Sequence, residues 1–389
     1  MSLAAQQALP VVLGALIAAG MVSFLLTPLA IRFAPRMGAM DEAVDERRVH
    51  RRPIPRTGGL AVAAAFVGVG VIGLAANELL EFAPALRTVR VPQLAALFGG
   101  VAIGASLGYV DDRFALRARW QLLGQLTLAA IALAGGILID SMVNPLGGDQ
   151  LSFALPAAMA VTTLWVVGMI NSVNFVDGLD GLLAGIALIA AATLGLISLL
   201  VPPVQPFVAV LCALLVGSLL GFLPYNFHPA RVFIGTAGVF AVGYALAVLS
   251  ILGTAKVAVA LLVLGVPIID TFWIIVRRVA SRRSPFSADR GHFHHRLLDL
   301  GLSHRQAVLL IYLLCAVLAV LSLVLSGRGQ ISAFMIIVVA SGVVLYLITR
   351  RAREALDRHS YEPSEEEPEP LEQVRSAGTE LTGGRRGET

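Results

Sequence analysis

Long apolar segments dominate this chain of 389 residues and limit the folds that it can adopt. Hydrophobic residues make up 57% of the sequence and charged residues only 14%, which is more apolar surface than one water-soluble core of this length can bury. A helix crosses the ~30 Å hydrocarbon layer of a membrane with about 20 apolar residues. Eleven segments have this character: 10–34, 58–80, 93–110, 120–140, 154–170, 182–200, 205–225, 232–251, 255–276, 304–326 and 330–349. The sequence therefore predicts an all-α fold, a polytopic membrane helix bundle with about eleven transmembrane helices.

The positions of the arginines predict how this bundle is oriented. Arginines are concentrated in the connections that follow the first, third, seventh and ninth apolar segments. Because positively charged loops tend to stay in the cytoplasm, we expect the N-terminus outside and the C-terminus inside. The acidic residues discussed below and all seven histidines fall on the same, cytoplasmic side. This one-sided distribution argues against an ion-coupled transporter, which carries its acids near the middle of the bilayer on broken helices.

The composition changes abruptly near the C-terminus. A glutamate- and proline-rich run at 365–370 and a glycine- and arginine-rich end follow the last apolar segment, and neither can bury a core. We predict an integral membrane domain at 1–351 and a disordered cytoplasmic tail at 352–389. The two cysteines fall inside apolar segments, which is typical of small core residues rather than of a disulfide.

A polar run at 171–182 interrupts the apolar pattern between the fifth and sixth segments. It contains Asn171, Asn174, Asp177 and Asp180 together with two glycines. Acids at the edge of a bilayer are costly, and two acids three residues apart share one face of a helical turn. Glycines let the backbone approach a ligand closely. A turn between two spans explains the glycines but not the acids, so we interpret this run as a site for a phosphate or nucleotide held by a metal ion.

Two adjacent acids, Asp111 and Asp112, end the third apolar segment. Neighbouring side chains on a helix point about 100° apart, so the two carboxylates are expected to have different roles. One of them can hold a metal ion while the other orients or deprotonates an acceptor. A solvated helix end is the alternative interpretation, and the shared cytoplasmic side with Asp177 and Asp180 favours the functional one.

Two basic loops lie on the same side. One contains His292, His294, His295 and Arg296, a spacing without the thiolate or carboxylate that would complete a zinc site. Imidazole and guanidinium donors suit a diphosphate, and a basic loop on anionic lipid is the alternative. In the other loop, His50 and Arg56 flank two prolines and are expected to face the site, unless the arginines of that loop serve only as topology signals.

Taken together, these motifs resemble the polyprenyl-phosphate N-acetylhexosamine-1-phosphate transferases of glycosyltransferase family 4. The resemblance extends in order over residues 36–306, and the His-x-His-His-Arg form is similar to the N-acetylglucosamine branch. It implies transfer of a sugar 1-phosphate from a UDP-sugar to undecaprenyl phosphate, with release of UMP and with Mg²⁺ or Mn²⁺ as cofactor. It also implies a helical bundle with a cytoplasmic active-site cleft, a multi-pass protein of the bacterial inner (plasma) membrane, a possible homodimer and no nucleic-acid partner.

The resemblance also implies roles for individual residues. Asp111 and Asp112 would handle the lipid phosphate beside the metal. Asn174, Asp177 and Asp180 would bind the nucleotide and the metal, with the metal at Asp177 and Asp112. The diphosphate would be held by His292, His294, His295 and Arg296, and Phe233 would stack against uracil.

One position departs from the family pattern. Where the family has an aspartate that serves as its principal metal ligand, this chain has Thr236, whose neutral hydroxyl gives no charge to a hard cation. Two hypotheses follow: an active transferase in which the remaining carboxylates and the substrate hold the metal, or a weak or inactive relative that binds nucleotide-sugar or lipid. The survival of the other motifs favours the active enzyme.

Overall fold

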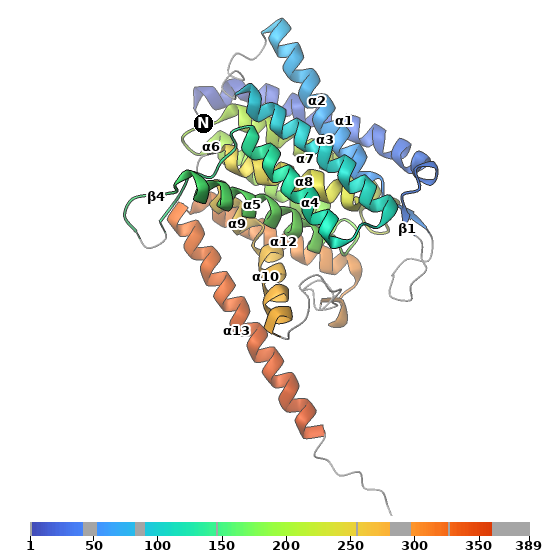
Figure 1. Ribbon diagram of the computed structural model, residues 1–389, viewed down its shortest axis with the longest axis vertical. Coiled ribbons are helices and arrows are strands. Elements are labelled where there is room, and N and C mark those ends of the chain that lie inside the picture. Colours follow the sequence, from blue (N-terminus) through green and yellow to red (C-terminus); the bar gives the residue numbers. More distant parts are fainter. Residues whose placement is uncertain are drawn as a thin grey trace, which may run out of the picture. The chain divides into compact units, whose positions relative to one another are not determined.

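The computed structural model is built almost entirely of α-helices (Figure 1). It describes residues 2–41, 53–81, 90–144, 147–253, 256–280, 297–325 and 327–359. The helices are α1 (Leu3–Met37), α2 (Gly58–Leu80), α3 (Val91–Phe114), α4 (Ala118–Ala134), α5 (Leu155–Val176), α6 (Leu182–Leu200), α7 (Pro206–Asn226), α8 (Gly235–Leu252), α9 (Lys256–Val263), α10 (Gly265–Ala280), α12 (His304–Val324) and α13 (Gly327–His359). The chain separates into two units, 1–339 and 340–389, and the site described below lies in the first.

The helices confirm an all-α membrane protein but not the predicted number of spans. Among the described residues, eight helices are long and apolar enough to cross a membrane. Every predicted segment coincides with a helix, yet α4 has only 17 residues and the apolar part of α13 is short. The ninth predicted segment is divided between α9 and α10, which meet at 79° and count as one span at most, giving up to nine. The bent pair accounts for the ninth crossing, and the short α4 and the short apolar part of α13 account for the remaining two of the eleven.

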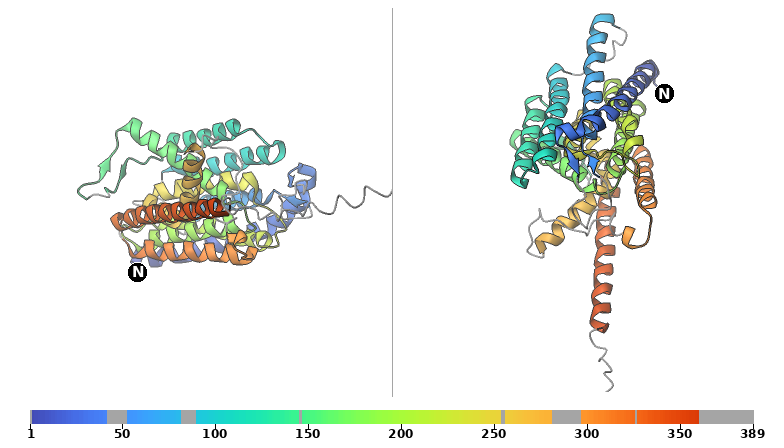
Figure 2. Two further views of the ribbon diagram at one scale, coloured as in Figure 1. Left: turned by 90° about the horizontal axis from the view of Figure 1, so that it is seen from below. Right: turned by 90° about the vertical axis from the view of Figure 1, so that its right-hand side faces the viewer.

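The helices α7 and α8 form the centre of the bundle. In each of them 83% of the most apolar window is buried, against 17% in α1. In Figure 2, α8 lies between α3 and α4 on one side and α12 on the other. Small residues permit close packing at this centre. A Cβ atom at Gly217 of α7 would lie 2.2 Å from the Leu16 carbonyl oxygen of α1, so only glycine fits at this crossing.

Two short hairpins mark opposite ends of these helices (Figure 1). At one end, β1 (Met40–Asp41) pairs antiparallel with β2 (Ile54–Pro55). At the other end, β3 (Ser141–Met142) pairs antiparallel with β4 (Leu151–Ser152). The C-terminal ends of α1, α3, α5 and α7 lie at the β1 end, together with the N-terminal ends of α2, α6, α8 and α12. The polar motifs of the sequence are therefore brought to this end.

The C-terminal helix passes the predicted domain boundary. Helix α13 continues to His359, so the part of the predicted tail directly after residue 351 is helical. The remainder of the tail lies outside the described residues. The prediction of a disordered tail is therefore not tested beyond His359.

Candidate active site

The acid-rich run at 171–182 forms the end of α5, a turn and the start of α6. Helix α5 ends where the Asp177 backbone N–H donates to the Asn174 carbonyl at 3.2 Å. On the other side of the turn, the hydroxyl of Tyr312 in α12 donates to the carbonyl oxygen of Gly181. The turn leaves the Asp177 side chain exposed and the Asp180 side chain half-buried. The two acids therefore lie at the polar end of the helices, as the sequence predicts.

The two adjacent acids of α3 make separate sets of contacts. Asp111 accepts at Oδ1 from the Leu116 backbone N–H at 3.0 Å and from Gln121 at 2.9 Å, which holds the turn between α3 and α4. Asp112 accepts from the backbone N–H groups of Thr236 at 2.9 Å and Ala237 at 3.0 Å. Both side chains are largely buried. The two carboxylates thus have different structural partners, and their predicted chemical roles stay predictions.

The segment around Thr236 is held against the loop that precedes α2. The Phe233 backbone N–H donates to the Pro55 carbonyl at 2.8 Å, and the Gly59 N–H donates to the Ile234 carbonyl at 2.8 Å. Gly235 has a left-handed φ of 67°, and a Cβ atom there would lie 2.4 Å from the Arg56 carbonyl oxygen. Two loops that are far apart in the sequence therefore meet at the Asp112 carboxylate. Arg56 belongs to one of these loops and is brought to the same region.

Arg56 faces the acids, as the sequence predicts. Its guanidinium donates to Asp41 at 3.0 Å and interacts electrostatically with Asp112 and Asp177. Among the described residues, this arginine is the positive charge that acts on both of these acids. Of the described residues whose charges act on Asp177, Asp112 and Asp180 are acids and only Arg56 is basic.

The electrostatic environment of Asp177 differs from that of an ordinary surface carboxyl. Its side chain is exposed, but surrounding protein atoms reduce its contact with bulk water, and this desolvation raises the pKa of Asp177 to about 7. The negative charge of Asp112 raises this pKa further, Arg56 lowers it, and Asp180 raises it. A bound cation would relieve the same repulsion.

These carboxylates fit a divalent cation. Hard cations prefer oxygen ligands, and among the described residues the Asp177 carboxylate has no hydrogen-bond partner. Asp112 uses each oxygen for one backbone N–H, which leaves lone pairs for a further contact. Thr236 is half-buried and brings no charge. Asp177 is therefore the carboxylate best placed to hold the ion, with Asp112 beside it.

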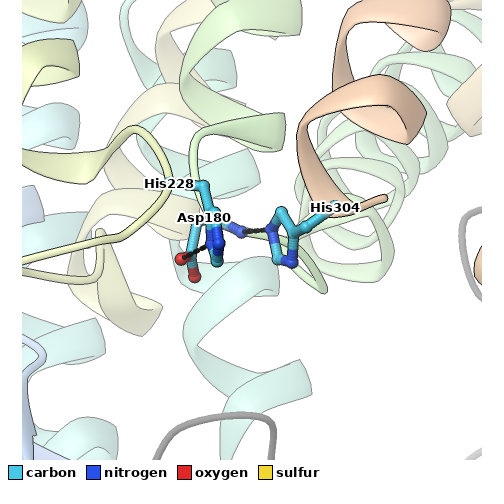
Figure 3. A group of neighbouring side chains, drawn as sticks. All are labelled: Asp180, His228 and His304. Atoms are coloured by element: carbon cyan, nitrogen blue, oxygen red, sulfur yellow. Dashed lines mark hydrogen bonds and ion pairs between the residues drawn. The ribbon is translucent and has the colours of Figure 1, made fainter. Parts of the chain in front are cut away.

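A second polar cluster consists of Asp180, His228 and His304 (Figure 3). The Asp180 carboxylate Oδ2 lies 2.8 Å from His228 Nδ1 and accepts from the Ala230 backbone N–H at 3.0 Å. The Asp180 backbone N–H donates to His304 Nε2 at 2.9 Å. Three possible ligand atoms lie within 4.8 Å of one another, but each already takes part in a hydrogen bond within the cluster. This geometry favours a hydrogen-bonded network over a metal site.

The remaining predicted residues are partly described. Asn174 is half-buried, and its carbonyl helps to end α5. Phe233 is half-buried in the segment held against β2. Their predicted contacts with the nucleotide are not tested. The predicted residues His50, His292, His294, His295 and Arg296 lie outside the described residues and stay predictions.

Three residues of this region were not predicted from the sequence. His228 and His304 each lie at the end of a span on the acid-rich side, and this shared location was the available signal. Gln121, which supports Asp111, lies in the first turn of α4 and gave no comparable signal.

Comparison with known proteins places the chain in a family. Residues 94–254 match the model of glycosyl transferase family 4. A probable undecaprenyl-phosphate N-acetylglucosaminyl 1-phosphate transferase of Bacillus subtilis is 34% identical over 321 residues, which covers 81% of this chain and 85% of the relative. The chain belongs to glycosyl transferase family 4.

Further relatives are consistent with this assignment. A decaprenyl-phosphate N-acetylglucosaminephosphotransferase of Mycolicibacterium smegmatis is 33% identical and covers 78% of this chain and 80% of the relative. An undecaprenyl-phosphate alpha-N-acetylglucosaminyl 1-phosphate transferase of Escherichia coli K12 is 26% identical and covers 76% and 80%. Family 4 membership thus agrees with the motifs and with the helical fold.

The raised pKa of Asp177 predicts how the stability of this family 4 protein depends on pH. Between about pH 4 and pH 7 the folded protein binds more protons at Asp177 than the unfolded chain does, so this group makes the stability fall as the pH rises. Asp177→Asn should remove this fall. We expect the melting temperature of the variant to exceed that of the wild type increasingly as the pH rises from 4 to 7.

Magnesium should reduce this difference, because ion binding stabilises the folded wild type and requires the carboxylate. Thermal unfolding of the detergent-purified proteins with and without Mg²⁺ measures both effects. A melting-temperature difference that is independent of pH and of Mg²⁺ would contradict the assigned environment of Asp177.

Proposed function

We propose that this protein transfers N-acetylglucosamine 1-phosphate from UDP-N-acetylglucosamine to a polyprenyl phosphate such as undecaprenyl phosphate, releasing UMP. The observation that carries the proposal is the convergence of Asp112, Asp177 and Arg56 at one end of the membrane helices. The names of the relatives support the same reaction, since they transfer N-acetylglucosamine phosphate to undecaprenyl or decaprenyl phosphate. The product would initiate a cell-envelope glycan.

The chemistry explains why charged residues gather here. An oxygen of the lipid phosphate attacks the β-phosphorus of the nucleotide-sugar, forms a new P–O bond and displaces UMP. Both reactants are anions, so positive charge must screen them as they approach. Arg56 supplies part of this charge. The basic residues at 292–296 are proposed to supply more by binding the diphosphate.

The acids would divide the remaining tasks. Asp177 and Asp112 would hold a Mg²⁺ or Mn²⁺ ion, which when bound neutralises phosphate charge and polarises the P–O bond that breaks. Asp111 keeps the turn after α3 in place and would act on the lipid phosphate. Asp180, in the same loop as Asp177, would bind the nucleotide. Phe233 would stack on uracil, and Asn174 would bind the nucleotide.

The location follows from the distribution of charge. We propose that the protein is a multi-pass protein of the bacterial inner membrane with a cytoplasmic active-site cleft and eleven crossings. Homodimerisation would leave this end of the helices free. None of the relatives compared above has a name that indicates an inactive protein, so the comparisons give no support to a non-catalytic role.

The reaction is tested directly by release of UMP. Purified wild-type protein should form UMP from UDP-N-acetylglucosamine only when a polyprenyl phosphate and Mg²⁺ are both present. Asp177→Asn should lower the rate by at least about a hundredfold, because a preorganised charge at the reacting phosphates is lost. Asp140→Asn is the matched control, since this exposed acid lies beside β3 at the opposite end of the helices and should leave the rate unchanged. The proposal would be refuted if the wild type released no UMP, or if Asp177→Asn and Asp140→Asn lowered the rate of UMP release equally.

Thr236→Asp tests how the site works without the acid of the family pattern. The added carboxylate brings an oxygen ligand and a charge, so the variant should bind Mg²⁺ more tightly in a calorimetric titration. Its transfer rate should rise if the other residues remain arranged for catalysis. Thr236→Asn has a similar volume without the charge and serves as control. A wild type that turns over rapidly with Mg²⁺ and loses activity in Thr236→Asp would show that the site depends on threonine.

The orientation is tested by labelling single cysteines with a membrane-impermeant maleimide in intact cells. Both natural cysteines are buried, which keeps the background low. Gln150→Cys, next to β4, should be labelled from outside, whereas Arg117→Cys, between α3 and α4, should react only after permeabilisation. The reverse pattern, or labelling of both positions from one side, would overturn the topology and the cytoplasmic site.

A further inference from the structure

His228 lies at the meeting point of three segments that are far apart in the sequence (Figure 3). Its Nδ1 atom bonds to the Asp180 carboxylate at 2.8 Å, and its ring stacks on the His304 ring with 4.2 Å between centroids. Nε and Nη2 of Arg305 donate to the His228 carbonyl at 3.1 and 3.0 Å. Both the backbone and the ring of His228 are therefore held in one orientation.

The donors and acceptors around the two rings determine which nitrogen atoms carry protons. The backbone N–H of Asp180 can only donate, so His304 Nε2 must accept and carries no proton. The Asp180 carboxylate accepts, so His228 Nδ1 must carry a proton. This arrangement leaves two ring atoms for other partners, Nδ1 of His304 and Nε2 of His228, and of these Nε2 of His228 belongs to the ring that the Asp180 carboxylate orients.

His228 Nε2 is accessible to such a partner. The His228 side chain is 34% exposed, and among the described residues Nε2 has no hydrogen-bond partner. Asp180, which orients the ring, is close enough to Asp177 for the two charges to interact. With a phosphoryl oxygen bound at Nε2, the ring would carry a proton on each nitrogen and lie as a cation between the carboxylate and the phosphate. A donor in this position suits a phosphoryl oxygen.

We propose that His228 binds a phosphate group of the substrate through Nε2 and that the Asp180 carboxylate is the positioning group for it. The proposal rests on the proposed function, because that reaction brings the phosphates to Asp177. A phosphoryl oxygen of the nucleotide-sugar and one of the lipid phosphate have the same chemistry. The alternative is a purely structural cluster that joins three loops. In that case ligand affinity should depend only on the hydrogen bond between His228 and Asp180 and not on Nε2.

Two substitutions at His228 distinguish a phosphate-binding role from a purely structural one. In His228→Asn, the amide nitrogen takes the place of Nδ1, so the bond to Asp180 is kept and the donor at Nε2 is lost. In His228→Gln, the amide nitrogen reaches the place of Nε2 instead. We expect His228→Asn to keep the wild-type melting temperature but to bind the phosphate ligand about ten- to a hundredfold more weakly, as for the loss of one charge-assisted hydrogen bond. His228→Gln should bind more tightly than His228→Asn.

A matched control is available at the neighbouring ring. His304→Gln keeps an acceptor for the Asp180 backbone N–H without adding or removing a group at Nε2 of His228. We expect ligand binding by this variant to stay within about twofold of the wild type, close to the scatter expected for a neutral surface change. If His304→Gln lost as much ligand affinity as His228→Asn, the cluster would act as a structural unit. That result would overturn the proposal.

Binding is measured by calorimetry, so the result does not depend on turnover. The probes are UDP-N-acetylglucosamine and undecaprenyl phosphate in detergent. Weaker binding of the first by His228→Asn assigns His228 to the diphosphate, and weaker binding of the second assigns it to the lipid phosphate. Unchanged binding of both probes, or tighter binding by His228→Asn than by His228→Gln, overturns the proposal. A wild type that binds but does not transfer would instead refute the proposed function, so the two failures are distinguishable.

Discussion

The carboxylate of Asp112 is the contact on which the polar end of this protein depends. The first backbone N–H groups of a helix have no partner within the helix, and at α8 two of them are satisfied by this one side chain. Such a cap contributes about 1 kcal/mol in soluble proteins, and burial at the end of α3 increases the cost of losing it. Because Gly235 also lies against the Arg56 carbonyl, the same contact fixes the loop that carries Arg56. The acid and the cation of the site are therefore positioned together.

Hydropathy and charge were sufficient to predict that the acids gather at one end of the helices. Each of the four acids was expected at a helix end on one side, and the structure places Asp111, Asp112, Asp177 and Asp180 there. This succeeds because a membrane forces helices to begin and end at its two faces, so the edges of apolar segments locate polar loops. The position of Arg56 at the same end was expected for a similar reason, since its loop ends on the same side, but its interaction with these acids was not predicted.

Which loops touch one another could not be predicted in this way. The segment at 53–59 pairs with 233–234, and the turn after α5 meets the start of α12, because helices that are distant in sequence pack side by side. Apolar periodicity records neither that neighbourhood nor the partners of a polar side chain. His228 was missed because it gains its significance from Asp180 and Arg305, two residues of other segments. The bend between α9 and α10 was missed because the two halves together form one continuous apolar segment in the sequence.

The four acids differ in how their charge is compensated, and this difference assigns their roles more sharply than their spacing does. Asp111, Asp112 and Asp180 each accept two hydrogen bonds, so their charges are stabilised by donors that belong to the fold. Asp177 accepts none among the described residues, and the charges of Asp112 and Asp180 act against its ionisation. A carboxylate in this position gains most from an external cation. An aspartate at position 236 would share a bound cation with Asp177. With Thr236 in that position, Asp177 is the carboxylate whose charge a bound cation would compensate most.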